Sequence, residues 1–150
     1  MPKIDLTLPK GAVDAETLAE LPGQLAAALH KCEKAPDNEL FRSLAWTHVH
    51  ELDAAAIHTA DGPADKPQFV VGVTVPEGGL SEKAIAGLAG EATALVGDAA
   101  GLPEEERIRI WVLVQEIDEG KWGAGGNVIR FEELRASLRA QREQAAAPAS

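Results

Sequence analysis

The 150-residue chain has a single cysteine, Cys32, so it can form no internal disulfide and offers no cysteine-rich metal site. A reducing compartment fits this composition, and we expect the protein to be cytoplasmic. No segment approaches the ~18 uninterrupted apolar residues that a membrane span requires. The first residues also lack the basic region and apolar run of a secretory signal. We therefore expect neither a membrane partner nor secretion.

Positive charge is scarce as well, with 14 basic residues against 24 acidic ones and a net charge of −10. Such a surface repels phosphate backbones and anionic lipids, so nucleic-acid partners are not expected. No P-loop, dinucleotide fingerprint or Ser-His-Asp pattern is present, and we expect no cofactor. An anionic substrate would require a locally positive pocket within this acidic protein.

His48 and His50 alternate along an expected strand and so share one face of it. A His-x-His pair can begin a metal site, but the sequence does not reveal the remaining ligands. A polar strand face or a subunit contact is the favoured interpretation, and no metal is expected.

The sequence repeats a pattern of strand, turn and helix. Alternating apolar residues predict a strand over 3–8, the Pro9-Lys10-Gly11 turn ends it, and Asp14 is the expected N-cap of a helix. The same order returns from residue 69, with Ser81 as the expected cap. Matching residues lie 67 positions apart (Pro9 and Pro76, Gly11 and Gly78, Leu18 and Ile85, Leu21 and Leu88) or 65 apart (Trp46 and Trp111, Glu51 and Glu116, Leu52 and Ile117). Two similar β-α-β halves are the simplest interpretation.

The repeat predicts an α+β fold in which tandem β-α-β units form a four-stranded sheet with two helices on one face. We expect one domain over 1–150: repeat 1 at approximately 2–53, a linker at 54–67, repeat 2 at approximately 68–128, and a C-terminal helix and tail at 130–150. Pro22-Gly23 is expected to kink or divide the first helix. The second strand is expected at about 40–52. Trp46 and Trp111 indicate that the uncovered sheet face is buried, and other subunits are the expected cover.

Pro2 is the strongest candidate for chemistry. Removal of Met1 would expose a secondary amine at the start of a strand, and modest desolvation can bring the pKa of such an amine close to neutrality. In apolar surroundings it would act as a general base, and in polar surroundings it would stay protonated and act as an acid. The second repeat has no equivalent, because Pro67 is internal and its nitrogen is an amide.

A second informative segment, residues 115–126, runs from an apolar strand through an acidic turn to Trp122-Gly123-Ala124-Gly125-Gly126. Taken alone, it predicts a hairpin whose glycines supply positive φ and whose tryptophan fills a gap. Together with Met1-Pro2 and Gly11, it resembles the tautomerase superfamily, that of 4-oxalocrotonate tautomerase. The resemblance covers approximately residues 1–130. The fused length, the linker and His30 look most like the cis-3-chloroacrylic acid dehalogenase branch.

The resemblance implies a homotrimer whose pockets lie between subunits, with Pro2 as the catalytic residue. It implies that Trp122 keeps the amine in apolar surroundings and that His30 binds substrate; a histidine favoured at a helix C-terminus is the alternative for His30. Family members also clamp a substrate carboxylate with arginines, which this chain lacks at the matching places. Lys10 and Arg109 are the substitutes expected here, and Arg42 and Arg130 are more distant candidates.

These observations predict a cofactor-independent isomerase that catalyses keto-enol tautomerisation of a small carbonyl or 2-oxo acid compound. Pro2 would move the proton, while Lys10, Arg109 or His30 would stabilise the enolate or bind a carboxylate. Two alternatives stay open. One is a hydratase, dehalogenase or decarboxylase of acrylate-like acids, which would need a protonated Pro2. The other is a non-catalytic trimeric homologue that lost the arginine clamp.

Overall fold

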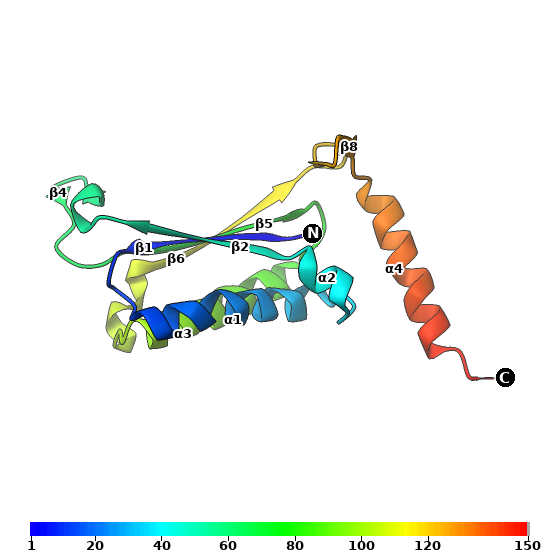
Figure 1. Cartoon of the computed structure of the whole chain (residues 1–150), viewed down its shortest axis with the longest axis horizontal. Coiled ribbons are helices and arrows are strands. Elements are labelled where there is room, and N and C mark those ends of the chain that lie inside the picture. The colour runs from blue at the N-terminus through cyan, green and yellow to red at the C-terminus, as the bar shows by residue number, and fades with distance from the viewer. Residues whose placement is uncertain (150) are drawn as a thin grey trace.

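The computed structural model describes residues 1–149, which form two β-α-β units and a C-terminal helix (Figure 1). The first unit contains β1 (Lys3–Pro9), α1 (Ala15–Glu33), α2 (Glu39–Ser43) and β2 (Trp46–Leu52). The second contains β5 (Phe69–Pro76), α3 (Glu82–Ala99), the 3-10 helix η2 (Glu104–Arg109) and β6 (Ile110–Ile117). The segment between them holds η1 (Ala54–Ala56), β3 (His58–Thr59) and β4 (Gly62–Pro63). After β6 come β7 (Gly123–Ala124), β8 (Asn127–Val128) and α4 (Phe131–Ala146).

The four long strands form one sheet in the order β2-β1-β5-β6. Each unit contributes a parallel pair, and the two central strands are antiparallel, with Lys3 opposite Thr74 and Thr7 opposite Val70. Because of this antiparallel pairing, the beginning of β1 lies beside the end of β5. Pro2 is therefore close to the turn that follows β5, and far from the turn that follows its own strand.

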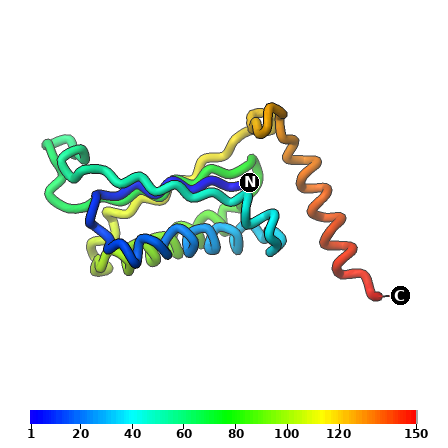
Figure 2. The backbone as a smooth tube through the Cα atoms, in the orientation of Figure 1, coloured from blue at the N-terminus to red at the C-terminus, as the bar shows by residue number. Residues whose placement is uncertain are grey.

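Both long helices cover the same face of this sheet (Figure 2). Ile4, Leu6 and Leu8 alternate along β1 and point toward the helices, where each is at most 2% exposed. They meet a stripe on each helix, formed by Leu21, Leu25 and Leu29 of α1 and by Leu88, Ala92 and Val96 of α3. The predicted α+β class and the placement of two helices on one face are confirmed.

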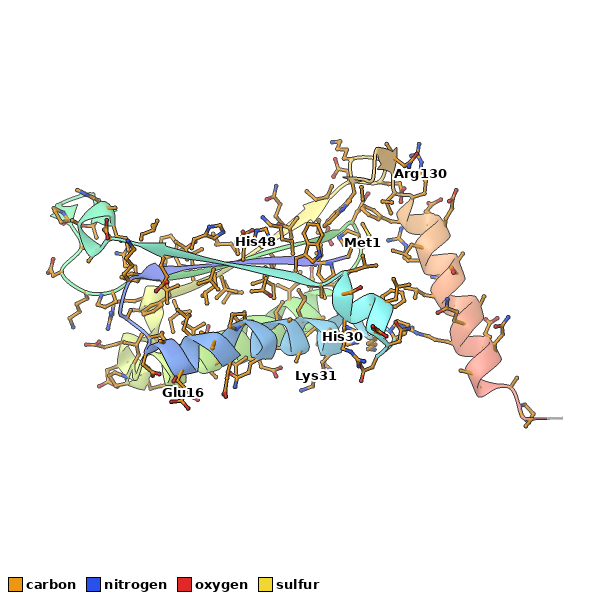
Figure 3. The ribbon with its side chains drawn as sticks, viewed as in Figure 1. Met1, Glu16, His30, Lys31, His48 and Arg130 are labelled. Atoms are coloured by element: carbon orange, nitrogen blue, oxygen red, sulfur yellow. The ribbon has the colours of Figure 1, made fainter. Side chains whose placement is uncertain are left out.

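The other face of the sheet carries large apolar side chains in the open. Trp46 is 59% exposed and Trp111 is 62% exposed, near opposite ends of the sheet, and Leu113 is 53% exposed. Figure 3 shows His48 on this open side, away from the helices. Exposed apolar surface of this extent is typical of an interface. We call this surface, which comprises Trp46, His48, His50, Trp111 and Leu113, the open face.

Local structure departs from the sequence-based expectations at two places. Residues 39–43 form the short helix α2 instead of the first part of a strand, because the Asn38 side chain accepts a hydrogen bond from the Phe41 amide at 3.0 Å and caps it. Pro22 does not divide α1, which runs unbroken from residue 15 to residue 33. Leu21 and Leu25, buried on both sides of the proline, hold the helix against the sheet. The predicted N-cap Asp14 is confirmed by its bond to the Thr17 amide at 2.9 Å.

Helix α4 extends away from the rest of the fold, and its first residue is its main anchor (Figure 1). Phe131 is 1% exposed, and Glu119 accepts hydrogen bonds from the amides of Phe131 and Glu132 at 3.1 and 3.2 Å. These bonds satisfy two of the donors that a helix start leaves unpaired. Within residues 1–149, no helix combines the length and the apolar composition needed to cross a membrane.

Candidate active site

A cavity of about 250 Å³ lies where the N-terminus, the end of α1, the turn after β5 and α4 meet. Met1 and Pro2 form one side, and His30 and Glu33 contribute from α1. Figure 3 shows Met1 and His30 near the same end of the sheet. The sequence-predicted residues Pro2 and His30 thus line one cavity, although they lie 28 positions apart in the chain.

The N-terminal amine lies in surroundings that disfavour its charged form. Burial lowers the pKa of the Met1 amine below its ordinary value, and the negative charge of Glu33 opposes this effect. Pro2 itself is buried, and its carbonyl accepts a hydrogen bond from the Trp46 amide at 3.2 Å. Removal of Met1 would place the free amine on Pro2, one residue further into the fold. An amine in this position suits general base chemistry near neutral pH.

Glu33 is a site residue that the sequence did not reveal. Burial raises the pKa of its carboxyl group, and the positive charge of the N-terminal amine partly offsets that rise. Glu33 lines the cavity together with Met1 and Pro2. The cavity therefore contains an amine and a carboxyl group that influence each other's protonation.

His30 presents an unsatisfied ring nitrogen. Its Nε2 atom is buried and has no hydrogen-bond partner within the described residues 1–149. A buried polar atom without a partner is costly and calls for an explanation. Because His30 lines the cavity, a bound ligand is a natural partner for this nitrogen.

Three arginines of α4 complete the cavity wall: Arg135, Arg139 and Arg142. Arg135 Nη1 donates to the Glu77 carbonyl oxygen at 2.7 Å, and Arg142 donates to the Lys34 carbonyl oxygen. Arg139 has neither a hydrogen bond nor an ion pair with any residue in the described part of the chain. The spacing of four and three residues, which places the arginines on one helical stripe, is visible in the sequence. Nothing in the sequence places that stripe next to Pro2.

Trp122 supports the cavity from behind. Its ring packs edge to face on Phe131, with ring centroids 6.0 Å apart, and Phe131 lines the cavity itself. Trp122 comes after β6 and immediately before the β7–β8 hairpin. The two loop residues of this hairpin, Gly125 and Gly126, have positive φ. The aromatic residues that line the cavity directly are therefore Phe131 and Phe41, and Trp122 lies behind Phe131.

Lys10 and Arg109 lie at the opposite end of the central strands from Pro2. Lys10 pairs with Asp53 at 3.1 Å, and Arg109 donates to the Pro67 carbonyl oxygen at 2.6 Å and pairs with Glu106. Lys10 is far from Pro2 because β1 pairs antiparallel with β5. This pairing brings the turn after β5 to Pro2 and leaves the turn after β1 beside Phe69. Within one chain, Lys10 and Arg109 do not join Pro2.

The more distant arginine candidates are also outside this cavity's lining. Arg42, within α2, pairs with Asp37 at 2.5 Å. Arg130 immediately precedes α4, and Figure 3 shows it at the start of that helix.

One cluster of possible metal ligands lies on the open face, away from the cavity. Asp5, His48 and His50 each have a ligand atom within 4.8 Å of the others. Asp5 is the third group that the sequence left unidentified, and its register opposite His48 on the neighbouring strand explains the contact. Both Asp5 oxygens already have partners: His50 Nε2 lies 2.7 Å from Oδ1, and Lys3 Nζ lies 2.9 Å from Oδ2. Asp5, His50 and Lys3 thus form a hydrogen-bonded network, and His48 lies beside it.

Residues 70–132 match a family model described as tautomerase enzyme. That segment contains β5 from its second residue, α3, β6 and the hairpin after Trp122. A search of curated proteins finds no sequence that matches this chain significantly.

Several solved structures share this fold. A member of the cis-3-chloroacrylic acid dehalogenase family superposes with a TM-score of 0.71 at 22% identity, over 95% of this chain and 96% of that one. Pt0534, solved after inactivation by 2-oxo-3-pentynoate, has a TM-score of 0.71 at 18% identity, over 88% and 98%. A fused 4-OT solved as an asymmetric trimer has a TM-score of 0.69 at 19% identity, over 84% and 94%. At these identities, the likeness shows a shared fold.

Proposed function

Because this chain has the fold of the fused tautomerase-superfamily proteins and its second repeat matches the tautomerase family, we propose that it is a cofactor-independent tautomerase that uses Pro2 as its general base. Removal of Met1 would free the Pro2 amine. The reaction is keto-enol tautomerisation of a small carbonyl or 2-oxo acid compound. The observation that carries this proposal is a buried Pro2 in a cavity where the N-terminal amine has a lowered pKa.

The reaction needs a group that takes a proton from one substrate atom and returns it to another. The neutral Pro2 amine accepts the proton from the enol oxygen, which leaves an enolate and a protonated amine. The protonated amine then delivers the proton to the α-carbon, so that the product is the neutral keto form and the amine is neutral again. Negative charge develops on the substrate oxygen during the transfer. Positive groups on the cavity wall stabilise this charge, and this stabilisation is larger in a site shielded from water.

Glu33 favours one alternative chemistry. A carboxylate beside the amine stabilises the protonated amine, the form required by a hydratase, dehalogenase or decarboxylase of acrylate-like acids. The lowered pKa of the Met1 amine favours the tautomerase, because burial outweighs Glu33 in its effect on that group and Pro2 is buried beside it. A non-catalytic trimeric homologue is the third possibility. In that case, the N-terminal amine has no exceptional reactivity.

Covalent labelling tests the proposal. Pt0534 was inactivated by 2-oxo-3-pentynoate, and we expect this chain to react with the same compound at Pro2, because an unprotonated amine adds to an activated alkyne. Mass spectrometry of the N-terminal peptide should show one adduct and no Met1. An N-terminal peptide that remains unmodified while lysines react would contradict the proposal.

Self-association is the second element of the proposal. We propose that the open face is covered by two further copies in a homotrimer, because relatives with this fold were solved as trimers and the exposed tryptophans need a cover. Light scattering should give the mass of three chains. Trp111→Glu should lower the trimer fraction, since a carboxylate would be buried without a partner. Ile108→Glu, at a residue that is 80% exposed before β6, serves as the control. A native protein that is monomeric at micromolar concentration would contradict this prediction.

The partners in this proposal are a small carbonyl or carboxylate compound and the chain itself. A cytoplasmic location is also proposed, since Cys32 is the single cysteine of the chain.

Replacement of Trp122 should change the pH dependence of activity. Trp122→Ala removes the support of Phe131 and admits water, so the pKa of the amine rises toward its ordinary value. The neutral amine exists above its pKa, so the rise of activity with pH should move to higher pH. A rise of one pH unit in this pKa lowers activity at a pH below it by about tenfold. The pH-rate profile measures this effect. A hydratase would keep its activity near neutral pH, because it needs the protonated amine.

A further inference from the structure

We propose that Asp5, His48 and His50 on the open face bind one divalent transition-metal ion per chain, of the class to which Zn²⁺ belongs. None of the three residues lines the cavity that contains Pro2, so the inference does not rest on the proposed function. An ion here would take no part in the proposed reaction. The sequence alone predicts no metal, because the third ligand comes from a different strand.

The sheet fixes the positions of all three ligands. His48 and His50 are two residues apart on β2, so their side chains leave the same face of the strand. β2 pairs in parallel with β1, and the register places Asp5 opposite His48. One ligand atom from each residue lies within 4.8 Å of the others. The two paired strands therefore bring the three groups together before any ion binds.

The donor set matches that of a three-ligand zinc site. Two imidazole nitrogens and one carboxylate oxygen are ligands that zinc takes in such sites, and a fourth position is left open. Imidazole favours zinc, nickel and copper, whereas Mg²⁺ and Ca²⁺ prefer oxygen ligands. Zinc lies about 2.0–2.2 Å from such atoms, so two of its ligands are at most about 4.4 Å apart. Both histidines are exposed, and a small rotation of one ring closes the difference.

Neighbouring side chains orient the ligands. The His48 ring stacks on Trp46, with ring centroids 6.4 Å apart. Lys3 Nζ donates to Asp5 Oδ2 at 2.9 Å, which leaves Oδ1 directed at His50 Nε2, 2.7 Å away. Outer contacts of this kind orient a ligating carboxylate. An ion bound at His50 Nε2 would replace the hydrogen on that nitrogen, and the neutral ring would then carry its hydrogen on Nδ1.

The charge and the location of the cluster suit a cation at this place. The net charge of −10 favours cations around the molecule and offsets the positive charge of Lys3. The cluster belongs to the open face, which we propose other copies cover, so the ion would lie at the contact between copies. Its fourth position is then available to water or to a group of a neighbouring copy. An ion between copies would exchange slowly, and the experiment must allow time for exchange.

Equilibrium dialysis against Zn²⁺ tests the site on the full chain, prepared without a histidine tag and freed of metal with a chelator. Metal analysis should show one Zn²⁺ per chain, and an excess of Mg²⁺ should not displace it. Outer contacts of a metal site alone contribute about 10- to 100-fold to affinity, so His48→Gln and His50→Gln should each weaken binding at least tenfold.

His58→Gln is the matched control. His58 is also exposed, lies on β3 outside the cluster, and has its Nε2 atom 3.0 Å from the Ala55 carbonyl oxygen. The variant removes the same chemical group from the surface and should leave zinc binding intact. Equal losses of affinity in His50→Gln and His58→Gln would overturn the inference.

Nuclear magnetic resonance of the imidazole groups gives a second readout that does not depend on how a variant folds. Zn²⁺ should shift the ring signals of His48 and His50 and leave those of His30 and His58 in place. Shifts confined to His30 would place the ion in the cavity and would contradict the site on the open face. Failure of the native protein to take up Zn²⁺, or binding that survives both His48→Gln and His50→Gln, would also overturn the inference.

Discussion

Pro2→Ala is expected to lower kcat/KM for the ketonisation of phenylenolpyruvate by about 10²–10⁴-fold, the usual contribution of a positioned general acid or base. Alanine leaves a primary amine in nearly the same place after Met1 is removed, so the cavity and its arginines remain. The rigid ring and the orientation of the nitrogen are lost. Stopped-flow absorbance measurements on the native and variant proteins can resolve a loss of this size.

Pro67→Ala is the matched control for this substitution. β5 is the counterpart of β1 in the second repeat, and Pro67 lies shortly before it. The nitrogen of Pro67 is an amide and cannot accept a proton. Its carbonyl, which accepts a bond from Arg109, remains in the variant. We expect less than a twofold change. Equal activities of native protein and Pro2→Ala would exclude Pro2 as the base.

Phe131→Ala is expected to release α4 from the rest of the fold. Truncation of a buried phenylalanine costs about 3–5 kcal/mol, and Phe131 is the one residue of α4 that is fully buried within the described chain. The other polar links we find between α4 and the body are the amide hydrogen bonds that Glu119 accepts, the hydrogen bonds that Arg135 and Arg142 donate, and the Arg135–Glu119 ion pair. Most of this cost should therefore fall on the docking of the helix. Trypsin, which cuts after arginine, should then cleave α4 at least tenfold faster.

Leu88→Ala tests whether this release is local. Leu88 is 1% exposed in the core between α3 and the sheet, and its truncation should lower the free energy of unfolding of the whole protein by about 2–5 kcal/mol. In that variant, cleavage of α4 should follow global unfolding in urea. If Phe131→Ala leaves tryptic cleavage unchanged, α4 is held by contacts other than those described.

The sheet and its helices were predictable because their signals are local. Strict alternation of apolar residues over 3–8 identifies the face of β1 that meets the core, and the caps Asp14 and Ser81 mark the starts of the two long helices. The short helix α2 was missed, because its Asn38 cap is followed by only five helical residues, too few to show a helical period.

The composition of the site was less predictable, because it depends on which ends of the strands meet. A search for family arginines at the turn after β1 selects Lys10, but the antiparallel pairing of β1 with β5 carries that turn to the other end of the sheet. The stripe containing Arg139 could be found as a pattern on α4, yet its position beside Pro2 depends on the burial of Phe131 and on Glu119 at the helix start. These contacts join segments far apart in the sequence and leave no periodic signal.

The central claim is that the N-terminal nitrogen of the mature protein is a buried base that lines the cavity, and its protonation can be titrated directly. The measurement is the rate of covalent labelling of the N-terminal amine against pH, by mass spectrometry, in the native protein and in the same protein unfolded in urea. We predict a midpoint at lower pH in the native protein, because burial lowers the pKa of the Met1 amine and Pro2, one residue further in, is also buried. Identical midpoints in the two states, or a higher midpoint in the native protein, would contradict the account.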